Sequence, residues 1–250
     1  MIKTEIKNKT GIIILNRPEK RNALHPELIK QFKQKLVEFK IDENIKSIII
    51  TGEGSDFCAG ADIEYLNSLS EYSLKENLDD TNSLAELFMM IYEFPKPTIA
   101  AVNGTAIAGG CGLASACDFI IAHPEQSKFG YSEVKIGFLP AIVSIFLIKR
   151  VGEGLAKQLL IGAETIIGKR AYEIGFVNYL AENVLDEAIN LSAKLNSSSL
   201  ESIKMTKQMI NNISNLSVKD AVEYCIGLNI ISRSSNDFKN GINKFLVKEK

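Results

Sequence analysis

The sequence predicts an α/β protein with a parallel β-sheet covered on both faces, followed by a helical C-terminal region. Two observations support this fold class. Short, continuous apolar runs alternate with stretches of helical periodicity, which is the pattern of strands buried in a parallel sheet. From about Val184 onward, helical spacing dominates and no strong strand follows. We therefore expect a core over residues 1–195 and a helical region over residues 196–250, joined at Ser197–Ser199.

The predicted strands share a short apolar run closed by a turn. They are Ile12–Leu15, Ile48–Ile50, Thr98–Val102, Phe119–Ala122 and, more weakly, Phe176–Tyr179. Apolar residues at three- and four-residue steps predict one helix from Pro26 to about Phe39 and another through Leu84–Ile91. Pro95 and Pro97 end the second helix.

The composition excludes several classes of protein. Lys and Arg total 29 and Asp and Glu total 30 among 250 residues, and this near-neutral balance argues against a nucleic-acid partner. No apolar run reaches the ~18–20 residues of a membrane helix, and the charged start is no secretory signal. Four cysteines and two histidines lack disulfide-framework or metal-ligand spacing. We expect a cytoplasmic protein without a metal.

Two corners rich in glycine and alanine are candidates for binding a negatively charged oxygen. They are Asp56–Ile63 and Gly104–Gly112, and each follows a predicted strand, where open α/β sheets place their ligands. Small residues let a substrate approach the backbone, and two converging N–H groups form an oxyanion hole. Either corner taken alone is also consistent with a tight turn between a strand and a helix.

A third segment, Phe129–Ala141, supplies one acid. Glu133 stands there among apolar and small residues, where burial would raise the pKa of its carboxyl and suit it to proton transfer. The alternative is a glutamate in the first turn of a helix that Ser132 caps.

In this order and spacing, the three segments resemble the crotonase superfamily, also called the enoyl-CoA hydratase/isomerase family. The resemblance covers the whole chain, from Leu15–Pro18 and Arg21–Leu24 to a helical tail at Gly241–Phe245. It implies a spiral of ββα units with a helical C-terminal trimerisation region, and a homotrimer or a dimer of trimers. It also implies an acyl-CoA thioester as substrate, with no further cofactor.

The resemblance assigns roles to individual residues. Ala61 and Gly109 match the two backbone donors of the oxyanion hole, and Glu133 matches a general acid/base. The segment with Arg21 and Ala23 matches the binding site of the CoA adenine. Further candidates for substrate binding are Ala59, Asp62, Gly110, Gly112, Tyr131 and Pro140. Asp62 is also expected to cap a helix, and Tyr131 either lines the acyl pocket or only packs.

The sequence departs from the hydratase type at one position. Hydratases of the family place two glutamates on the substrate, and Gly112 occupies the first of those positions. The local pattern is similar to bacterial 3-methylglutaconyl-CoA hydratases, so we favour a hydratase acting on a short or branched 2-enoyl-CoA. A Δ3,Δ2-enoyl-CoA isomerase with one glutamate is the alternative. A non-catalytic member that binds acyl-CoA or RNA is a third hypothesis. Glu153 is a candidate for a second carboxylate near Glu133.

Overall fold

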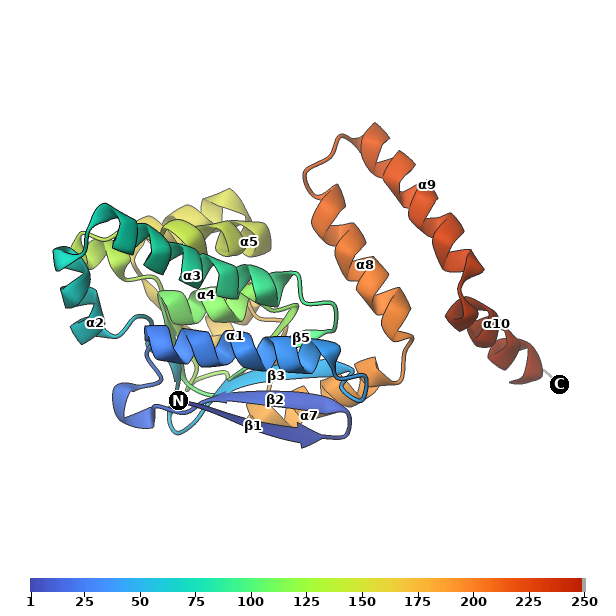
Figure 1. Ribbon diagram of the computed structural model, residues 1–250, viewed down its shortest axis with the longest axis horizontal. Helices are drawn as coiled ribbons and strands as arrows, with labels where there is room; N and C mark the ends of the chain where they lie inside the picture. Colours follow the sequence, from blue (N-terminus) through green and yellow to red (C-terminus); the bar gives the residue numbers. More distant parts are fainter. Residues whose placement is uncertain (249–250) are drawn as a thin grey trace.

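A six-stranded sheet forms the centre of the core in the computed structural model, which describes residues 1–248 (Figure 1). Residues 249–250, the end of the predicted helical region, lie outside the described residues. The strands follow the order β1 (Ile2–Lys7), β2 (Thr10–Leu15), β3 (Ser47–Gly52), β5 (Thr98–Val102), β7 (Phe119–Ala122) and β10 (Tyr179–Leu180). All neighbours are parallel except β1 and β2, which form an antiparallel hairpin.

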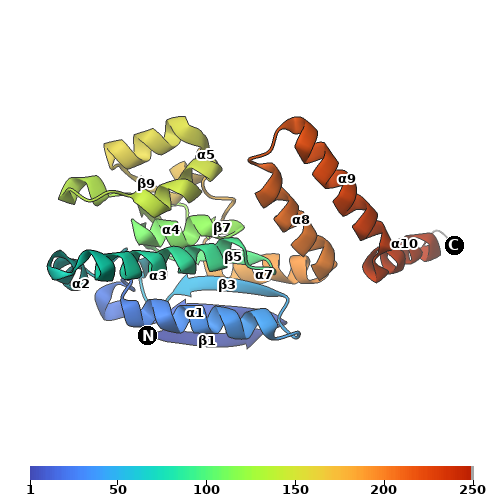
Figure 2. The same cartoon turned by 45° about the horizontal axis from the view of Figure 1, so that its top comes forward.

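Helices cover both faces of this sheet, as the sequence predicts. Ile48 and Ile50 of β3 pack in one apolar cluster with Phe32 of α1 (Pro26–Ile41). Ile49, pointing the other way, packs in a second cluster with Leu191 of α7 (Val184–Asn196). Figure 2 shows α1 and α3 (Leu74–Tyr92) side by side over the first face.

A second, smaller sheet carries the loops of interest. It consists of β4 (Asp56–Cys58), β6 (Thr105–Ile107), β8 (Lys128–Gly130) and β9 (Thr165–Ile167), in that order. The first three strands are parallel, and β9 is antiparallel to β8. Strands of three residues are too short to give a periodic pattern, so the sequence does not predict this sheet.

The remaining elements of the core lie in the connections between strands. They are the helices α2 (Ile63–Ser68), α4 (Gly109–Ala116), α5 (Ala141–Gly162) and α6 (Gly168–Glu173), and the 3₁₀ turns η1 (Pro18–Lys20), η2 (Leu69–Glu71) and η3 (Glu133–Ile136). The backbone of α5 is interrupted at Gly152, where φ is 75°.

Two strand predictions differ from the structure. The strand β1 is unpredicted because its two apolar residues, Ile2 and Ile6, are separated by three exposed polar or charged residues and form no apolar run. The strand expected at Phe176–Tyr179 begins only at Tyr179. The N–H groups of Phe176 and Val177 both donate to Ala171 O, at 2.9 and 3.1 Å, and so close α6 instead of entering the sheet.

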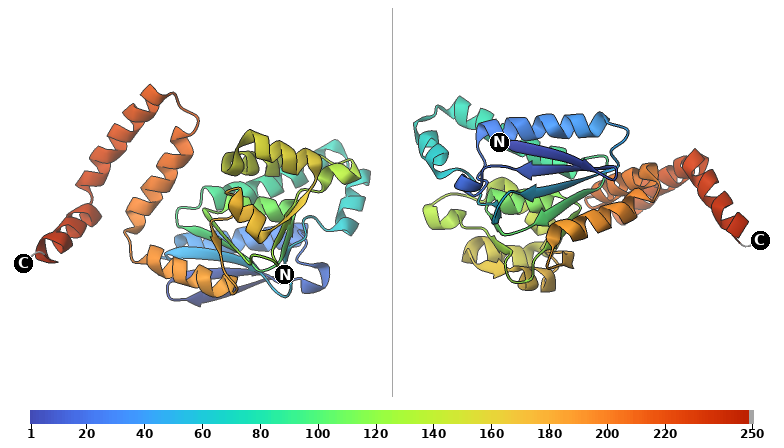
Figure 3. Two further views of the ribbon diagram at one scale, coloured as in Figure 1. Left: turned by 180° about the vertical axis from the view of Figure 1, so that it is seen from behind. Right: turned by 90° about the horizontal axis from the view of Figure 1, so that it is seen from below.

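A helical arm follows the core. It consists of α8 (Leu200–Ile213), α9 (Val218–Ser234) and α10 (Asn236–Lys248), and it projects away from the sheets (Figures 1 and 3). The chain turns between α7 and α8 at Ser197–Ser199, where the Ser199 side chain caps α8. No described residue of α8 or α9 is buried. Among the described helices, none combines the length and apolarity needed to span a membrane.

Candidate active site

The three segments singled out from the sequence lie at one edge of the small sheet. Ala61 follows β4, Gly109 follows β6, and Glu133 follows β8. Because these three strands are parallel neighbours, their carboxyl ends point to the same edge. The hydrogen bond from Ala108 N to Gly130 O, at 2.8 Å, continues the pairing beyond the end of β6.

The first two corners touch through their glycines. A Cβ atom added at Gly109 would lie 3.9 Å from the Cα atom of Gly60, and one added at Gly60 would lie 2.9 Å from Ile107 O. The segment 21–24 runs along the first corner. Ala59 N donates to Arg21 O at 3.0 Å, and Leu24 N donates to Gly60 O at 2.7 Å. Arg21, Ala23, Ala59 and Ala61 are thus brought together.

Two backbone donors at this edge are unbonded. Among the described residues, neither Ala61 N–H nor Gly109 N–H has a backbone or side-chain acceptor. Gly109 is the first residue of α4, so its N–H carries the partial positive charge of a helix N-terminus. Ala108 holds this turn at φ 50° and ψ −115°, a conformation that costs a non-glycine residue free energy and is typical of functional sites.

Glu133 is a buried carboxyl at the start of η3. Glu133 is only 7% exposed, and its Oε2 atom has no hydrogen-bond partner in the described structure. Burial raises the pKa of Glu133, and a hydrogen bond from its own backbone N–H opposes this shift. Glu133 lies in the first turn of η3 with Ser132 at the N-cap position, as the alternative interpretation expects, but the Ser132 side chain makes no capping bond.

The thiols near the site are protonated. Burial raises the pKa of Cys58 to about 12 and raises that of Cys111 as well. Cys111 donates to Ala106 O, at 3.0 Å, and packs within the core. Neither thiol is therefore a nucleophile at neutral pH.

Gly112 faces an apolar wall. A Cβ atom added there would lie 2.6 Å from Cγ1 of Val143 and 2.9 Å from Cζ of Phe88, closer than real Cβ atoms approach their neighbours. Glu153 does not stand in for a second carboxylate, because its exposed side chain on α5 pairs with Lys157 at 2.5 Å. Val143 and Phe88 are distant in sequence, so no sequence pattern reveals this wall.

The charged candidates are engaged in ion pairs. Arg21 forms two hydrogen bonds with Asp56, at 2.7 and 3.1 Å, which lower the pKa of that carboxyl. The neighbouring Lys20 pairs with Glu64 at 2.7 Å. Asp62 caps α2 through its side chain, as the sequence predicts.

Arg17 and Asn22 have structural roles beyond the sequence prediction. Arg17 is buried, pairs with Asp62 at 2.8 Å and donates to Ala23 O at 2.8 Å. Asn22 accepts from Arg17 N and donates to Glu53 O and Asp56 O. Together they hold the segment 21–24 in place.

The last two candidates lie on either side of Glu133. Tyr131 is 1% exposed and packs in the main core, and Pro140 is buried directly before α5.

The C-terminal end of α4 is held by the Arg150 guanidinium, which donates to the carbonyls of Ser115 and Cys117.

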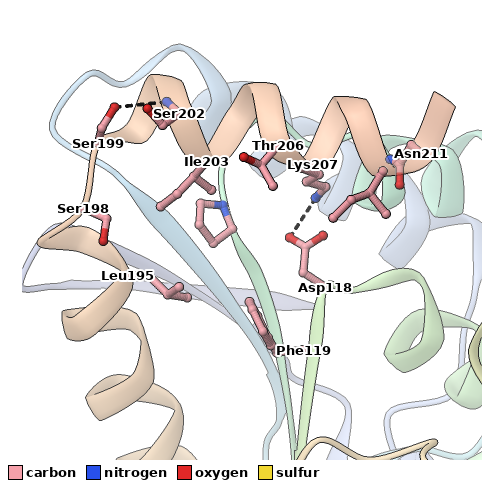
Figure 4. A pocket seen from close by; sticks show the side chains of 12 residues that line it. Asp118, Phe119, Leu195, Ser198, Ser199, Ser202, Ile203, Thr206, Lys207 and Asn211 are labelled. Atoms are coloured by element: carbon pink, nitrogen blue, oxygen red, sulfur yellow. Dashed lines mark hydrogen bonds and ion pairs between the residues drawn. The ribbon is translucent and has the colours of Figure 1, made fainter. Parts of the chain in front are cut away.

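A cavity of about 500 Å³ lies away from this edge, beyond the opposite end of α4. Its walls come from α8 and from the starts of β5 and β7 (Figure 4). Asp118 accepts there from Thr98 N at 2.8 Å and pairs with Lys207 at 2.9 Å.

Comparisons with known proteins agree with this arrangement. A sequence model of the family described as enoyl-CoA hydratase/isomerase matches residues 5–250. A Thermus thermophilus relative, provisionally named an enoyl-CoA hydratase, is 37% identical, with 99% of this chain and 98% of the relative covered. A crotonyl-CoA hydratase of Syntrophomonas wolfei is 33% identical, with 98% and 95% covered. The crystal structure of an enoyl-CoA hydratase from Polaromonas matches with a TM-score of 0.94 and 31% identity, covering 99% of this chain and 97% of that chain.

The family model and the solved structures match this chain over nearly its whole length, and they show that it is an enzyme of the crotonase superfamily. The chain belongs to the enoyl-CoA hydratase/isomerase family. The predicted crotonase-type α/β fold with a helical C-terminal region is confirmed. The closer resemblance to 3-methylglutaconyl-CoA hydratases stays a prediction.

The wall at Gly112 makes a first prediction. We expect Gly112→Glu to lower the free energy of unfolding by about 1–3 kcal/mol, the usual cost of overpacking a core, and not to raise hydration. Adding Val143→Ala should recover part of the lost stability, because it removes the nearest methyl group. Thermal unfolding and hydration assays on both variants, with Gly112→Ala as the smaller substitution, check this. A stable and more active Gly112→Glu enzyme would contradict the wall.

The buried carboxyl makes a second prediction. The raised pKa of Glu133 means that the folded state binds its proton more tightly than the unfolded chain, whose glutamate titrates near 4.5. The contribution of Glu133 to stability is therefore present below pH 4.5 and is lost as the pH rises through the raised value. Glu133→Gln should unfold at a higher temperature than the wild type at pH 7, with the difference shrinking toward pH 4. An equal difference at both pH values would rule out burial of the charged form as its cause.

Proposed function

We propose that the chain is an enoyl-CoA hydratase, a hydro-lyase that adds water to a short or branched 2-enoyl-CoA. The observation that carries this proposal is the meeting of three groups at one sheet edge: the unbonded N–H groups of Ala61 and Gly109, and the buried carboxyl of Glu133. Two N–H donors suit an oxygen that becomes negative during the reaction, and one such donor is worth about 10²–10³ in rate in other enzymes.

The proposed mechanism uses only these groups and the thioester. The thioester carbonyl accepts hydrogen bonds from Ala61 and Gly109, and it becomes an enolate as water adds to the β-carbon. Glu133 takes a proton from that water and then delivers a proton to the α-carbon. A pKa raised by burial suits both steps, because a group that titrates nearer to neutral pH can accept and release the proton.

A second candidate function is a Δ3,Δ2-enoyl-CoA isomerase. The apolar wall at Gly112 favours it, since no second carboxylate holds a water there. In this reaction Glu133 removes a proton from C2 and returns it to C4, while the same two N–H groups hold the enolate. The two candidates therefore share every residue of the site and differ in the fate of water.

The proposal includes the substrate and the surroundings of the enzyme. The mechanism needs acyl-CoA and water, with no metal and no nucleic acid, and the cytoplasm is the proposed location. The sequence resemblance supports a branched acyl group, and the similarity to the crotonyl-CoA hydratase of Syntrophomonas wolfei supports a crotonyl group. Arg21 and Ala23, beside the first corner, are the proposed contacts of the CoA adenine.

The first test compares wild-type protein with Glu133→Gln on crotonyl-CoA and 3-methylglutaconyl-CoA, with a chelator present. We expect the variant to lose at least about 10²-fold in kcat, the usual contribution of a general acid/base. Glu153→Gln is the matched control and should keep full activity, because that carboxylate is exposed and paired with Lys157. Equal turnover by the wild type and Glu133→Gln would remove Glu133 from the mechanism.

A companion assay separates the hydratase from the isomerase. A hydratase converts a 2-enoyl-CoA in H₂¹⁸O into a labelled 3-hydroxyacyl-CoA and leaves a 3-enoyl-CoA unchanged. Conversion of a 3-enoyl-CoA into an unlabelled 2-enoyl-CoA, together with no hydration of any 2-enoyl-CoA, would overturn the hydratase in favour of the isomerase.

The proposal also includes a homotrimer or a dimer of trimers. The arm supports it, because α8 and α9 bury no residue within one chain while presenting several apolar side chains. These include Ile210, Val222, Ile226, Ile230 and Ile231. A helix with an uncovered apolar face is stabilised by packing against another element.

This assembly makes a further prediction. Light scattering after gel filtration should give a mass of three or six times the 27.6 kDa of the chain. Ile226→Asp with Ile230→Asp should shift the protein toward monomers, because charges one turn apart on α9 would have to be buried. Asn229→Asp adds a charge to the same helix and is the matched control. A wild-type monomer, or an unchanged assembly in the double variant, would contradict the role of α9.

A further inference from the structure

Two buried polar atoms of one short segment have no hydrogen-bond partner among residues 1–248. They are the hydroxyl of Tyr131 and the Oε2 atom of Glu133, and both lie directly after β8. A third such atom, Asn196 Oδ1, lies at the end of α7 in another part of the fold. Buried polar groups without partners are rare because each costs folding free energy, so a pair within three residues indicates a shared role.

Cys111 and Ser115 are neighbours of the Tyr131 phenol, and each donates its own hydrogen to a backbone carbonyl. Cys111 Sγ donates to Ala106 O at 3.0 Å and lies within electrostatic reach of the phenol. Ser115 Oγ lies beside the phenol without hydrogen-bond geometry, and it donates to Gly112 O at 3.1 Å. Burial raises the pKa of Tyr131 well above its ordinary value. The phenol therefore stays protonated and offers its hydrogen as a donor.

Glu133 follows Tyr131 by two residues, and its negative charge acts on the phenol. Its charge contributes to raising the pKa of Tyr131, and one of its own oxygens is left for another donor. Position 112, where a second carboxylate would stand in a hydratase of the two-glutamate type, is closed by Val143 and Phe88. The phenol is thus a protonated polar group near Glu133 that the proposed mechanism does not yet use.

We infer that the Tyr131 hydroxyl is a positioning residue that holds one water molecule against Glu133 Oε2 for addition to the substrate. The inference rests on the proposed hydratase function and explains how hydration proceeds with a single carboxylate. Internal waters typically bond to buried polar groups that lack protein partners. The phenol donates to the water oxygen, and the water donates to Oε2.

The proton balance of the step is complete with these groups. The water oxygen forms a bond to the β-carbon while its proton passes to Glu133 Oε2. The electron pair of the carbon–carbon double bond moves into the thioester as the enolate. Glu133 then gives its proton to the α-carbon, so H and OH have been added and the enzyme is restored. Tyr131 keeps its proton throughout.

The test is Tyr131→Phe, which removes only the hydroxyl. A merely structural hydroxyl without a partner predicts unchanged activity and equal or greater thermal stability. Our inference predicts a kcat on crotonyl-CoA about tenfold lower with KM unchanged, the effect of one lost hydrogen bond. It also predicts that the acid limb of the pH profile moves to higher pH, because the carboxylate loses the hydrogen bond of an oriented water.

Two controls make the outcome decisive. Tyr92→Phe removes a hydroxyl from a half-buried tyrosine that packs on Phe146, and it should leave kcat and the pH profile unchanged. Ser115→Ala should leave the acid limb in place. If Ser115→Ala reproduces the Tyr131→Phe effect, the phenol acts through α4 and the water-holding role is wrong. Wild-type hydration that is lost in Glu133→Gln but unchanged in Tyr131→Phe overturns this inference alone, whereas a wild type without hydration overturns the proposed function.

Discussion

The parallel pairing of β4, β6 and β8 is the constraint on which the candidate site depends. Parallel neighbours deliver their carboxyl ends to one edge, so loops that are far apart in sequence open onto the same place. The bond from Ala108 N to Gly130 O ties the second loop to the third and fixes where α4 begins. A helix of eight residues starting there directs its first N–H toward the edge, and Arg150 neutralises the partial negative charge at its other end.

Glycines allow close backbone packing at both ends of β6. A Cβ atom at Gly104 would overlap Ser55 O, and one at Gly110 would overlap Cys58 O, although neither glycine has a positive φ. These two close backbone contacts set the separation between β4 and the β6–α4 unit. The distance between the donors at Ala61 and Gly109 is therefore determined by backbone packing, which is more rigid than a contact between long side chains.

Much of this arrangement could be predicted from the sequence, because the informative residues stand in contiguous motifs. Local pattern and family resemblance predict the apolar strands β2, β3, β5 and β7. They also predict which segments carry Ala61, Gly109 and Glu133, although not the short strands that directly precede these segments. The rest depends on contacts between distant segments. Val143 and Phe88 meet Gly112 only in the folded chain, and Asp56 becomes the partner of Arg21 only through the pairing of two loops. The three-residue strands carry no periodicity at all.

One apolar environment also selects which group carries the proton. Burial raises the pKa of four acids around the site, which are Cys58, Cys111, Tyr131 and Glu133. The ordinary pKa is 9.0 for a thiol and 10.0 for a phenol, so burial moves these pKa values further from neutral pH and keeps the groups protonated. The ordinary pKa of a glutamate carboxyl is 4.5, so burial moves this pKa toward neutral pH. Glu133 thereby becomes the one of these four acids that can accept and release a proton under working conditions, which ties the chemistry of the site to a single carboxyl and to the groups that orient its water.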